Sequence, residues 1–478
     1  MRVFSESRHS VSSDAPDVDV GSRLPSPADD SAAGAAPSSS CSSPKPALDA
    51  AALGALPTAV DVVIIGGGII GISTAYALAK AGVSVCVCEK GRLAGEQSSR
   101  NWGWVRTLTR DVAEVPLAMR ANAMWADIQA RADVGFRRTG LLYLQENDAD
   151  AAAHAKWIAA ARDHGLDATL LTRDAAARHL PPSSRTWTGA MFSASDGVAE
   201  PQRATQGIAG LAQDLGAKVF EHCAVRGIES SAGQVTAVIT ERGVVRTQAV
   251  VIAGGAWSRL FCGNLGADFP QLKVRGSVLR TAPFEAPLHA AVNGKDFTCR
   301  KRGDGGYTVS QFGASMADVV PDSFRLMHHF GRAWLANREF VRLRFGKRFF
   351  EELRTPRRFA VNRETPFERC RVLDPAPSAK GVSQAWARLI ETFPVFGQAR
   401  IAQSWAGYID VTPDALPVMS AVPHHAGLFL ASGFSGHGFG IGPAAGELMA
   451  NLVQGNALGV DAAPFRFGRF SRFGAQKA

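Results

Sequence analysis

The stretch Val60-Asp61-Val62-Val63-Ile64-Ile65-Gly66-Gly67-Gly68-Ile69-Ile70-Gly71 is a short apolar run that ends in a glycine-rich turn. The apolar part has the length and composition of a buried parallel strand. Residues 69–81 then predict a helix with small side chains on one face, and residues 83–88 predict a second apolar strand. Together these segments predict one β-α-β unit.

The glycines of this turn have the spacing G-x-G-x-x-G, and each one has a physical role in dinucleotide binding. Gly66 permits the tight turn, Gly68 lets the backbone approach a pyrophosphate, and Gly71 lets helix and strand pack closely. The phosphates would lie at the helix N-terminus, where free N–H groups and the helix dipole favour anions. Glu89 ends the second strand and is placed to bind a ribose. The sequence therefore predicts a dinucleotide-binding domain.

The composition indicates a globular protein and argues against a membrane-spanning, secreted or nucleic-acid-binding one. The chain has 478 residues, of which 46% are hydrophobic and 20% charged, as expected for a globular protein of two or three domains. We find no apolar run long enough to span a membrane and no secretory signal. The net charge of +9 is spread along the chain without a nucleic-acid-binding signature, so no nucleic-acid partner is expected. The seven scattered cysteines predict buried thiols, no metal site and a reducing, cytoplasmic setting.

The predicted secondary structure and the arginine content change along the chain, and these changes predict its domains. A helix at 204–215, strands at 218–222, 235–239 and 244–253, and a strand, glycine turn and helix over 427–453 continue the first unit. The middle of the chain is richer in arginine, with a strand at 307–310 and a basic helical stretch at 330–353. We expect an α/β (α+β) fold, with a Rossmann-like domain built from separated segments and an inserted antiparallel-sheet substrate domain.

The expected boundaries follow from these segments. The Rossmann-like domain takes residues 59–115, 196–270 and 396–460, and the substrate domain takes 116–195 and 271–395. Residues 1–58 have few large apolar side chains and predict a disordered N-terminal tail, and 461–478 predict a C-terminal tail.

Three blocks of the sequence resemble the FAD-dependent D-amino-acid oxidase, glycine oxidase and sarcosine oxidase family. They are residues 62–106, which include the Gly/Ser-rich loop after the second strand, residues 250–258, and the glycine-rich residues 431–443. In the last block the glycines let backbone amides crowd against a flat ring, and the following helix directs its N-terminus at the flavin's pyrimidine edge. The alternative is an ordinary glycine-rich loop before a helix.

The resemblance implies FAD held without a covalent link. The residues it implies for cofactor binding are Gly66, Gly68, Ile69, Ile70, Gly71, Glu89, Lys90, Ser98, Ser99, Asn101, Val225, Ala253, Gly254, Trp257, Gly433, Gly436, His437, Gly438, Phe439 and Gly440.

The activity implied by the resemblance is oxidation of the C–N bond of an amino acid or N-substituted amino acid, by hydride transfer to flavin N5. Such chemistry demands no dedicated acid or base, and a carboxylate substrate calls for an arginine fork. FAD-dependent oxidation of a hydroxy acid at C–OH, or a role as the flavin-binding subunit of a multi-protein oxidase, are the alternatives.

The chain departs from its relatives at four positions. Ala406 stands where sarcosine oxidases have the flavin-linking cysteine, and Ile409 where glycine oxidases have a carboxylate-binding arginine. Gly440 replaces a carboxylate-binding lysine, and Thr308 an oxygen-activating lysine. We therefore expect a dehydrogenase that passes electrons to a quinone or protein acceptor, in preference to an oxidase that uses O2.

Candidate catalytic residues remain open between functional and structural roles. Arg106, Arg302 or Arg300 could anchor a carboxylate, or each could be an exposed or structural arginine. Tyr408 could shape the pocket or be a core tyrosine, and His437 could face the flavin or bond the backbone of its loop. Trp102 and Trp104 could wall the pocket or pack a domain junction.

The basic side chains between residues 338 and 358 predict a solvated helix face or, alternatively, a docking surface for an acidic partner subunit. We expect no transmembrane segment, and a protein that is cytoplasmic or peripheral to the inner membrane.

Overall fold

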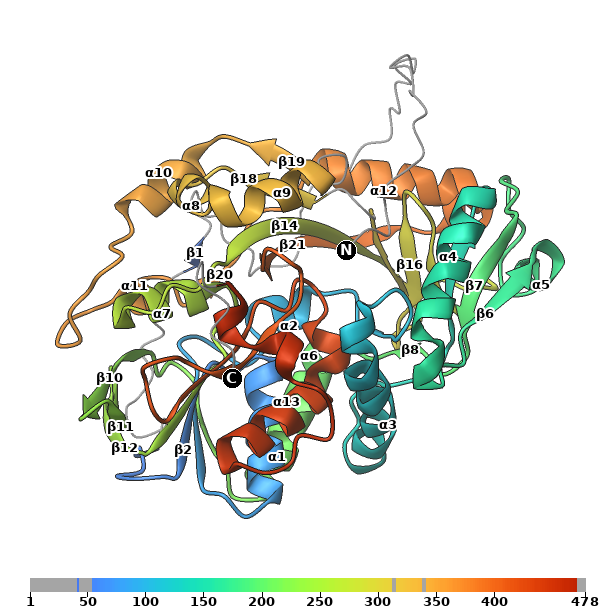
Figure 1. Cartoon of the computed structure of the whole chain (residues 1–478). Coiled ribbons are helices and arrows are strands. Elements are labelled where there is room, and N and C mark those ends of the chain that lie inside the picture. The colour runs from blue at the N-terminus through green and yellow to red at the C-terminus, as the bar shows by residue number, and fades with distance from the viewer. Residues whose placement is uncertain (1–40, 43–53, 312–314, 338–340, 471–478) are drawn as a thin grey trace.

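The computed structural model describes residues 41–42, 54–311, 315–337 and 341–470. Figure 1 shows two parts: a lower one that holds α1 (Ile69–Lys80) and α13 (Gly438–Gln454), and an upper one crossed by two long strands, β14 (Leu272–Thr281) and β21 (Ile401–Val411). The predicted fold class is confirmed, because a Rossmann-like unit is assembled from separated segments and joined to a second sheet.

The lower part is built on a six-stranded sheet with the order β22-β23-β13-β2-β3-β9. Its neighbouring strands are parallel except for the pair β22–β23. The strands are Val418–Ala421, Leu428–Ser432, Ala249–Ile252, Val62–Ile65, Val85–Cys88 and Lys218–Phe220, in that order. The central strands are buried on both faces, which is why they are continuous apolar runs in the sequence.

Helices cover one face of this sheet and a smaller sheet covers the other. α1, α13 and α6 (Pro201–Asp214) contribute to one apolar core, and α1 packs closely against α13 and α6. The second core includes side chains of the antiparallel sheet β10-β11-β12, whose strands are Val225–Ser231, Gln234–Thr240 and Gly243–Arg246.

The single strand predicted at 244–253 is wrong. The chain leaves β12 at Arg246 and enters the parallel sheet as β13 at Ala249. Between them, Thr247 Oγ1 donates to the carbonyl oxygens of Asp61 at 2.8 Å and Ala249 at 3.0 Å. This threonine side chain ties the turn that separates two strands with similar apolar sequences.

The upper part is a ten-stranded sheet. Its order is β19-β18-β14-β17-β16-β15-β5-β7-β6, and β21 pairs with β14 in addition. Most pairs are antiparallel, as predicted, but β15–β5 and β18–β19 are parallel. The remaining strands are Val341–Arg344, Ser315–Asp318, Tyr307–Ser310, Thr298–Lys301, Ala291–Asn293, Leu141–Gln145, Gly189–Ser193 and Thr169–Thr172, in the same order.

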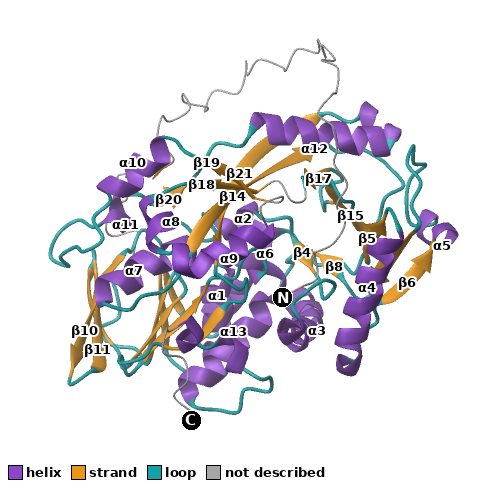
Figure 2. Cartoon of the chain, turned by 45° about the horizontal axis from the view of Figure 1, so that its top comes forward, coloured by secondary structure: helices purple, strands orange, loops and turns teal. Residues whose placement is uncertain are grey.

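Helices lie along this sheet and at its edge. Figure 2 shows α12 (Ala379–Thr392) across the strands near β17, and α4 (Asp148–Ala161) beside β5 and β6. Shorter elements complete the description: α2 (Gln97–Arg100), α5 (Arg173–Ala177), α7 (Ser258–Leu265), α11 (Pro366–Arg369), and the short strand pairs β4 (Trp104–Val105) with β8 (Gly197–Val198) and β1 (Cys41–Ser42) with β20 (Val372–Leu373).

Two segments lie in a different part from the one expected. α3 (Val115–Arg131) was expected in the substrate domain, but its apolar face packs against α13 in the lower part, with Trp125 fully buried. β21 was expected in the Rossmann-like domain, but it pairs with β14 of the upper sheet over nearly its whole length.

The basic helical stretch predicted at 330–353 is helical at both ends but is interrupted by a strand. The chain there forms α9 (Met327–Asn337), the strand β19 and α10 (Lys347–Arg354), after the short helix α8 (Pro321–Arg325). Val341-Arg342-Leu343-Arg344 alternates apolar and basic residues, which is a strand pattern, and it pairs with β18. Residues 338–340 lie outside the described residues.

The predicted tails are partly ordered. Cys41–Ser42 pairs with β20, and the N–H of Arg246 donates to the carbonyl oxygen of Thr58 at 3.1 Å. Near the other end, Phe465 is fully buried, and Phe467 packs against the second core. The rest of both predicted tails, 1–40, 43–53 and 471–478, falls outside the described residues.

The cysteine prediction holds for the five free thiols, Cys86, Cys88, Cys223, Cys262 and Cys299, which are all buried. Cys370 differs because it is disulfide-bonded, which its isolated position did not predict. Within the described ranges no helix is long and apolar enough to cross a membrane, and no cluster of acidic, histidine and cysteine side chains is arranged to hold a metal ion.

Candidate active site

A cavity of about 1910 Å³ runs from the N-terminus of α1, past β14 and β21, to the N-terminus of α13. Most of the residues predicted to bind the cofactor line it: Gly66, Gly68, Ile69, Ile70, Glu89, Lys90, Ser98, Asn101, Val225, Ala253, Gly254, Trp257, Gly436, His437, Gly438, Phe439 and Gly440. Gly71 in α1, Ser99 in α2 and Gly433 after β23 do not line it.

At the α1 end, glycines allow backbone segments to meet. Gly66 has φ +113°, and a Cβ at Gly71 would lie 2.0 Å from the Gly66 carbonyl oxygen, so only a hydrogen fits there. Gly68 precedes α1 and provides no side-chain cap. Ser98 Oγ accepts from the Ile69 N–H at 2.8 Å, and the N-terminus of α1 faces the cavity. The geometry suits a phosphate group.

Glu89 is held rigidly beside this N-terminus. Its Oε2 accepts from the Gly67 N–H and its Oε1 from the Gly91 N–H, both at 2.7 Å. Burial raises the pKa of Glu89, and it outweighs the opposing effects of Lys90 and the two N–H groups. Each oxygen keeps a lone pair that can accept a hydroxyl proton from a ligand.

Glu96 is a site residue that the sequence did not single out. Lys90 Nζ donates to Glu96 Oε1 at 2.7 Å, and Trp257 Nε1 donates to the same oxygen at 3.0 Å. Lys90 also donates to the carbonyl oxygens of Cys370 and Arg371. The pair therefore ties the wall of the cavity to the segment that follows α11.

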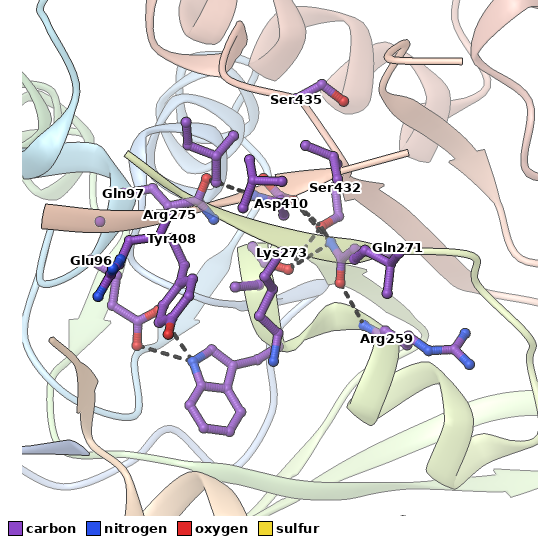
Figure 3. A pocket seen from close by; sticks show the side chains of 18 of the residues that line it. Glu96, Gln97, Arg259, Gln271, Lys273, Arg275, Tyr408, Asp410, Ser432 and Ser435 are labelled. Atoms are coloured by element: carbon purple, nitrogen blue, oxygen red, sulfur yellow. Dashed lines mark hydrogen bonds between the residues drawn. The ribbon is translucent and has the colours of Figure 1, made fainter. Parts of the chain in front are cut away.

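A buried network around Asp410 supports the glycine-rich loop before α13 (Figure 3). Asp410 Oδ2 accepts from the Gly433 N–H at 2.7 Å, from Gln271 Nε2 at 2.9 Å and from Ser432 Oγ at 3.2 Å. Burial raises the pKa of Asp410, although these hydrogen bonds oppose the shift. The sequence signal was an acidic residue between Ile409 and Val411, near the end of strand β21.

The glycines at the start of α13 serve helix packing. A Cβ at Gly440 would lie 2.8 Å from the Trp104 carbonyl oxygen, and one at Gly442 would lie 2.7 Å from Ile69 Cγ1. Trp125 Nε1 donates to the Gly440 carbonyl oxygen at 2.7 Å. α13 begins at Gly438, inside the block 431–443 that was expected to precede the helix.

His437 and Arg106 both line the cavity close to this helix. His437 Nδ1 lies 2.9 Å from Glu114 Oε2, and burial lowers the pKa of His437 although Glu114 opposes the shift. Arg106 Nη1 donates to the Leu108 carbonyl oxygen and, at 2.6 Å, to Thr109 Oγ1. Arg106 is thus held by its own loop.

Tyr408 lines the cavity further along β21. Its hydroxyl donates to Asp318 Oδ2 at 3.1 Å, and the Arg348 guanidinium lies 5.4 Å from the ring centroid. Burial raises the pKa of Tyr408 to about 12. The hydroxyl therefore stays protonated.

The remaining arginine candidates lie outside the cavity lining. Arg300 is 1% exposed and forms a two-point ion pair with Glu200, whose pKa it helps to lower to about 2 against the cost of burial. Arg302 pairs with Asp304 at 3.1 Å. Among the four departures, Ile409 and Gly440 line the cavity, whereas Ala406 and Thr308 do not.

Sequence reasoning also missed Arg110, which lines the cavity and is buried between Arg106 and His437. One of its two partners, the carbonyl oxygen of the N-cap residue His437 before α13, is 327 positions away in the chain, so no local pattern identifies this contact.

Comparison with known proteins identifies the class. The family model described as "FAD dependent oxidoreductase" matches residues 61–452, so this chain belongs to that family, named DAO, and is an FAD-dependent oxidoreductase.

Individual relatives cover almost all of the same region. Sarcosine oxidase subunit beta of Arthrobacter is 25% identical over 86% of this chain and 91% of its own length, and glycine oxidase of Geobacillus kaustophilus is 27% identical over 86% and 97%. The structure of L-amino acid deaminase from Proteus myxofaciens in complex with anthranilate has a TM-score of 0.84 and 32% identity, over 88% of this chain and 95% of that one.

Proposed function

We propose that this chain oxidises the C–N bond of an amino acid or N-substituted amino acid, and that FAD and substrate meet in the cavity between α1, β21 and α13. The observation that carries the proposal is this single cavity, which joins the α1 N-terminus to a cluster of arginine and histidine side chains. The relatives support the substrate class, because they include glycine and sarcosine oxidases and an amino acid deaminase.

The residues at the α1 end fit FAD. The N-terminus of α1, where the N-cap Gly68 has no capping side chain, would hold the pyrophosphate, and Glu89 would accept from the ribose hydroxyl groups. Ser98, Asn101 and the Gly436–Gly440 loop would hold the flavin end, with the N-terminus of α13 directed toward it. We propose domain limits that add α3 to the FAD-binding part and assign β21 to the substrate-binding part.

The side chains near α13 would prepare the substrate. Trp102 and Trp104 line the cavity with ring centroids 5.1 Å apart and would exclude water on one side. His437, with its lowered pKa, is neutral at neutral pH and places no cation beside the substrate amine. When bound, FAD supplies the acceptor for two electrons and a hydrogen from the substrate C–H bond.

The electron acceptor that we propose is a quinone or a protein in preference to O2. Thr308 stands where oxidases of the family have a lysine, and its Oγ1 accepts from Arg302 away from the cavity. Lys273, which does line the cavity, is held by Glu352 at 2.8 Å.

A role as one subunit of a larger oxidase is the second candidate. The segment around α8–α10 exposes several large apolar side chains on this chain, among them Phe324, Leu335, Leu343, Phe345 and Leu353. The relative named sarcosine oxidase subunit beta supports this candidate. A solitary chain that is fully active after size-exclusion chromatography would contradict it.

An anaerobic flavin-reduction screen tests the proposed reaction. Amino acids, N-methyl amino acids and hydroxy acids are mixed with the purified yellow protein, and bleaching of the flavin is followed. We expect bleaching by one or more amines, and faster reoxidation by a quinone than by air. Bleaching by hydroxy acids alone, or protein that cannot be loaded with FAD, would contradict the proposal.

A further inference from the structure

Arg110 occupies an unusual position in the cavity wall. The residue is only 3% exposed, yet it is among the residues that line the cavity. Nε donates to the Arg106 carbonyl oxygen and Nη2 to the His437 carbonyl oxygen, both at 3.4 Å, which is long for a hydrogen bond. Nη1 is buried and has no hydrogen-bond partner in the described part of the chain. The tip of this arginine is therefore held weakly and lacks one acceptor.

The other cations of the cavity wall are better satisfied. Lys90 pairs with Glu96, and Lys273 pairs with Glu352. Arg275 keeps an unpartnered Nε, but its two tip nitrogens contact the Ala376 carbonyl oxygen and Met316 Sδ. Among the described residues that line the cavity, Arg110 alone has a buried guanidinium tip nitrogen without a partner.

No acidic side chain of the described residues forms an ion pair with Arg110. Glu114 is turned toward His437 and forms no ion pair with Arg110, although its own Oε1 also has no hydrogen-bond partner. Asp196 is engaged by the N–H groups of Thr107 and Leu108 and by Asn122. Burial and then Arg106 lower the pKa of Arg110 to about 9, so it remains a cation at neutral pH. A buried guanidinium nitrogen without an acceptor is costly, and an anion that accepts from it would remove that cost.

We propose that Arg110 anchors the carboxylate of the substrate. The inference rests on the proposed function and restricts its substrates to amines that carry a carboxylate. A Cβ at Gly440 would lie 3.4 Å from Arg110 Nη2, so the guanidinium lies close to the backbone at the start of α13. A planar guanidinium binds a carboxylate through parallel N–H···O bonds, which an ammonium group cannot reproduce. Arg106, the arginine that the sequence favoured, has its Nη1 occupied by Leu108 and Thr109.

The same nitrogen could instead face an oxygen of the flavin, since both ligands offer anionic or carbonyl oxygens. The two sources have different signatures. A substrate anchor discriminates between a free carboxylate and its neutral amide, whereas a flavin contact changes the electron affinity of the flavin for every ligand. Benzoate and benzamide have the same shape and differ in charge, and sulfite affinity reports the electron affinity of the flavin.

The experiment uses the full chain loaded with FAD. Benzoate, benzamide, propionate and sulfite are titrated while the flavin absorbance is recorded, for the wild type and for Arg110→Gln, Arg110→Lys and Arg120→Gln. Arg120 is a matched control, because its exposed guanidinium pairs with Glu447 on the outer side of α13. We expect Arg110→Gln to weaken benzoate binding about 10- to 100-fold. Arg110→Lys should weaken it about tenfold, and benzamide and sulfite affinities should stay within about threefold of the wild type.

Several results would overturn the anchor. They are wild-type-like benzoate affinity in Arg110→Gln, a changed sulfite affinity with unchanged benzoate affinity, or no response of the wild-type flavin to either carboxylate. If Arg110→Gln does not retain FAD, the benzoate titration of Arg110→Lys, which keeps the charge, tests the proposal. Failure of the proposed reaction is separate: benzoate binding that depends on Arg110, in a protein that no amino acid reduces, would keep the anion site and refute the amine oxidation.

Discussion

The two ends of the cavity differ in whether their buried polar side chains have hydrogen-bond partners within the protein. At the α1 end, Glu89 directs both oxygens to backbone N–H groups, and Ser98 Oγ accepts from the Ile69 N–H. At the α13 end, Arg110 and Glu114 each keep a buried atom without a partner among the described residues. The polar side chains of the α1 end are thus fixed by the protein before a ligand binds, as suits a cofactor that stays bound. The α13 end is completed by its ligand, as suits a substrate that exchanges.

The largest expected effect tests the rigidity of the α1 end. Gly71→Ala would place its Cβ 2.0 Å from the Gly66 carbonyl oxygen, so helix and strand would have to separate. We expect little or no FAD in the purified variant, measured as the ratio of flavin to protein absorbance. Gly210→Ala is the control, because a Cβ at that position in α6 meets nothing within 4 Å. Normal flavin content in Gly71→Ala would show that the turn tolerates a side chain.

A second variant tests the ribose contact. Glu89→Gln keeps the shape but turns one acceptor oxygen into an NH2 donor, which would face a backbone N–H. We expect FAD affinity to fall about 10- to 100-fold in a titration of the apoprotein. Glu229→Gln, at an exposed position in β10, should leave FAD affinity unchanged. An unaltered affinity in Glu89→Gln would remove Glu89 from the cofactor site.

The local structure of the α1 end could be predicted from sequence, whereas the long-range contacts of the α13 end could not. Residues 62–88 form a β-α-β unit by local pattern, because each strand and the helix carry their own periodicity and glycine spacing. The contact of Arg110 with His437, by contrast, joins positions 327 residues apart. Asp410 and Gln271 are likewise separated by 139 residues. Whether a buried polar atom has a hydrogen-bond partner depends on such long-range contacts, which the sequence of a single segment does not predict.

The error at 330–353 has a local cause. Arginine and lysine favour helices in general, and the composition outweighed the alternation of Val341-Arg342-Leu343-Arg344. Pairing with β18 selects the strand there, and the Arg344 guanidinium reaches Asp318 at 2.6 Å. The period-2 pattern was present and was the better guide.

The pH dependence of anion binding is the third test of the comparison. Arg110, with its pKa lowered to about 9 by burial and by Arg106, is a cation below that pH and neutral above it. Benzoate affinity should therefore be constant between about pH 7 and 8 and fall as the pH rises through about 9. The affinity of benzamide should not follow this profile. A flat benzoate profile up to pH 10.5 would show that the cation is not needed or that its pKa is not lowered.

A smaller effect separates the two arginines of the α13 end. Arg106→Gln removes a side chain that is bound to its own loop, so carboxylate binding should weaken only about two- to fivefold, through a shift of that loop. The measurement is the same benzoate titration, with KM for a reactive amino acid where one is found. A larger loss in Arg106→Gln than in Arg110→Gln would reverse the assignment of the anchor.

The smallest expected effect concerns Tyr408, which lines the cavity away from the α13 end. Tyr408→Phe removes the hydroxyl that donates to Asp318, while Arg344 continues to pair with that carboxylate. We expect Tm to fall by about 1–3 °C, with KM and kcat within about twofold of the wild type. Thermal unfolding monitored by flavin fluorescence and steady-state kinetics provide the two measurements. A KM raised tenfold at unchanged Tm would extend the substrate site along β21, and the exchangeable end of the cavity would then include Tyr408.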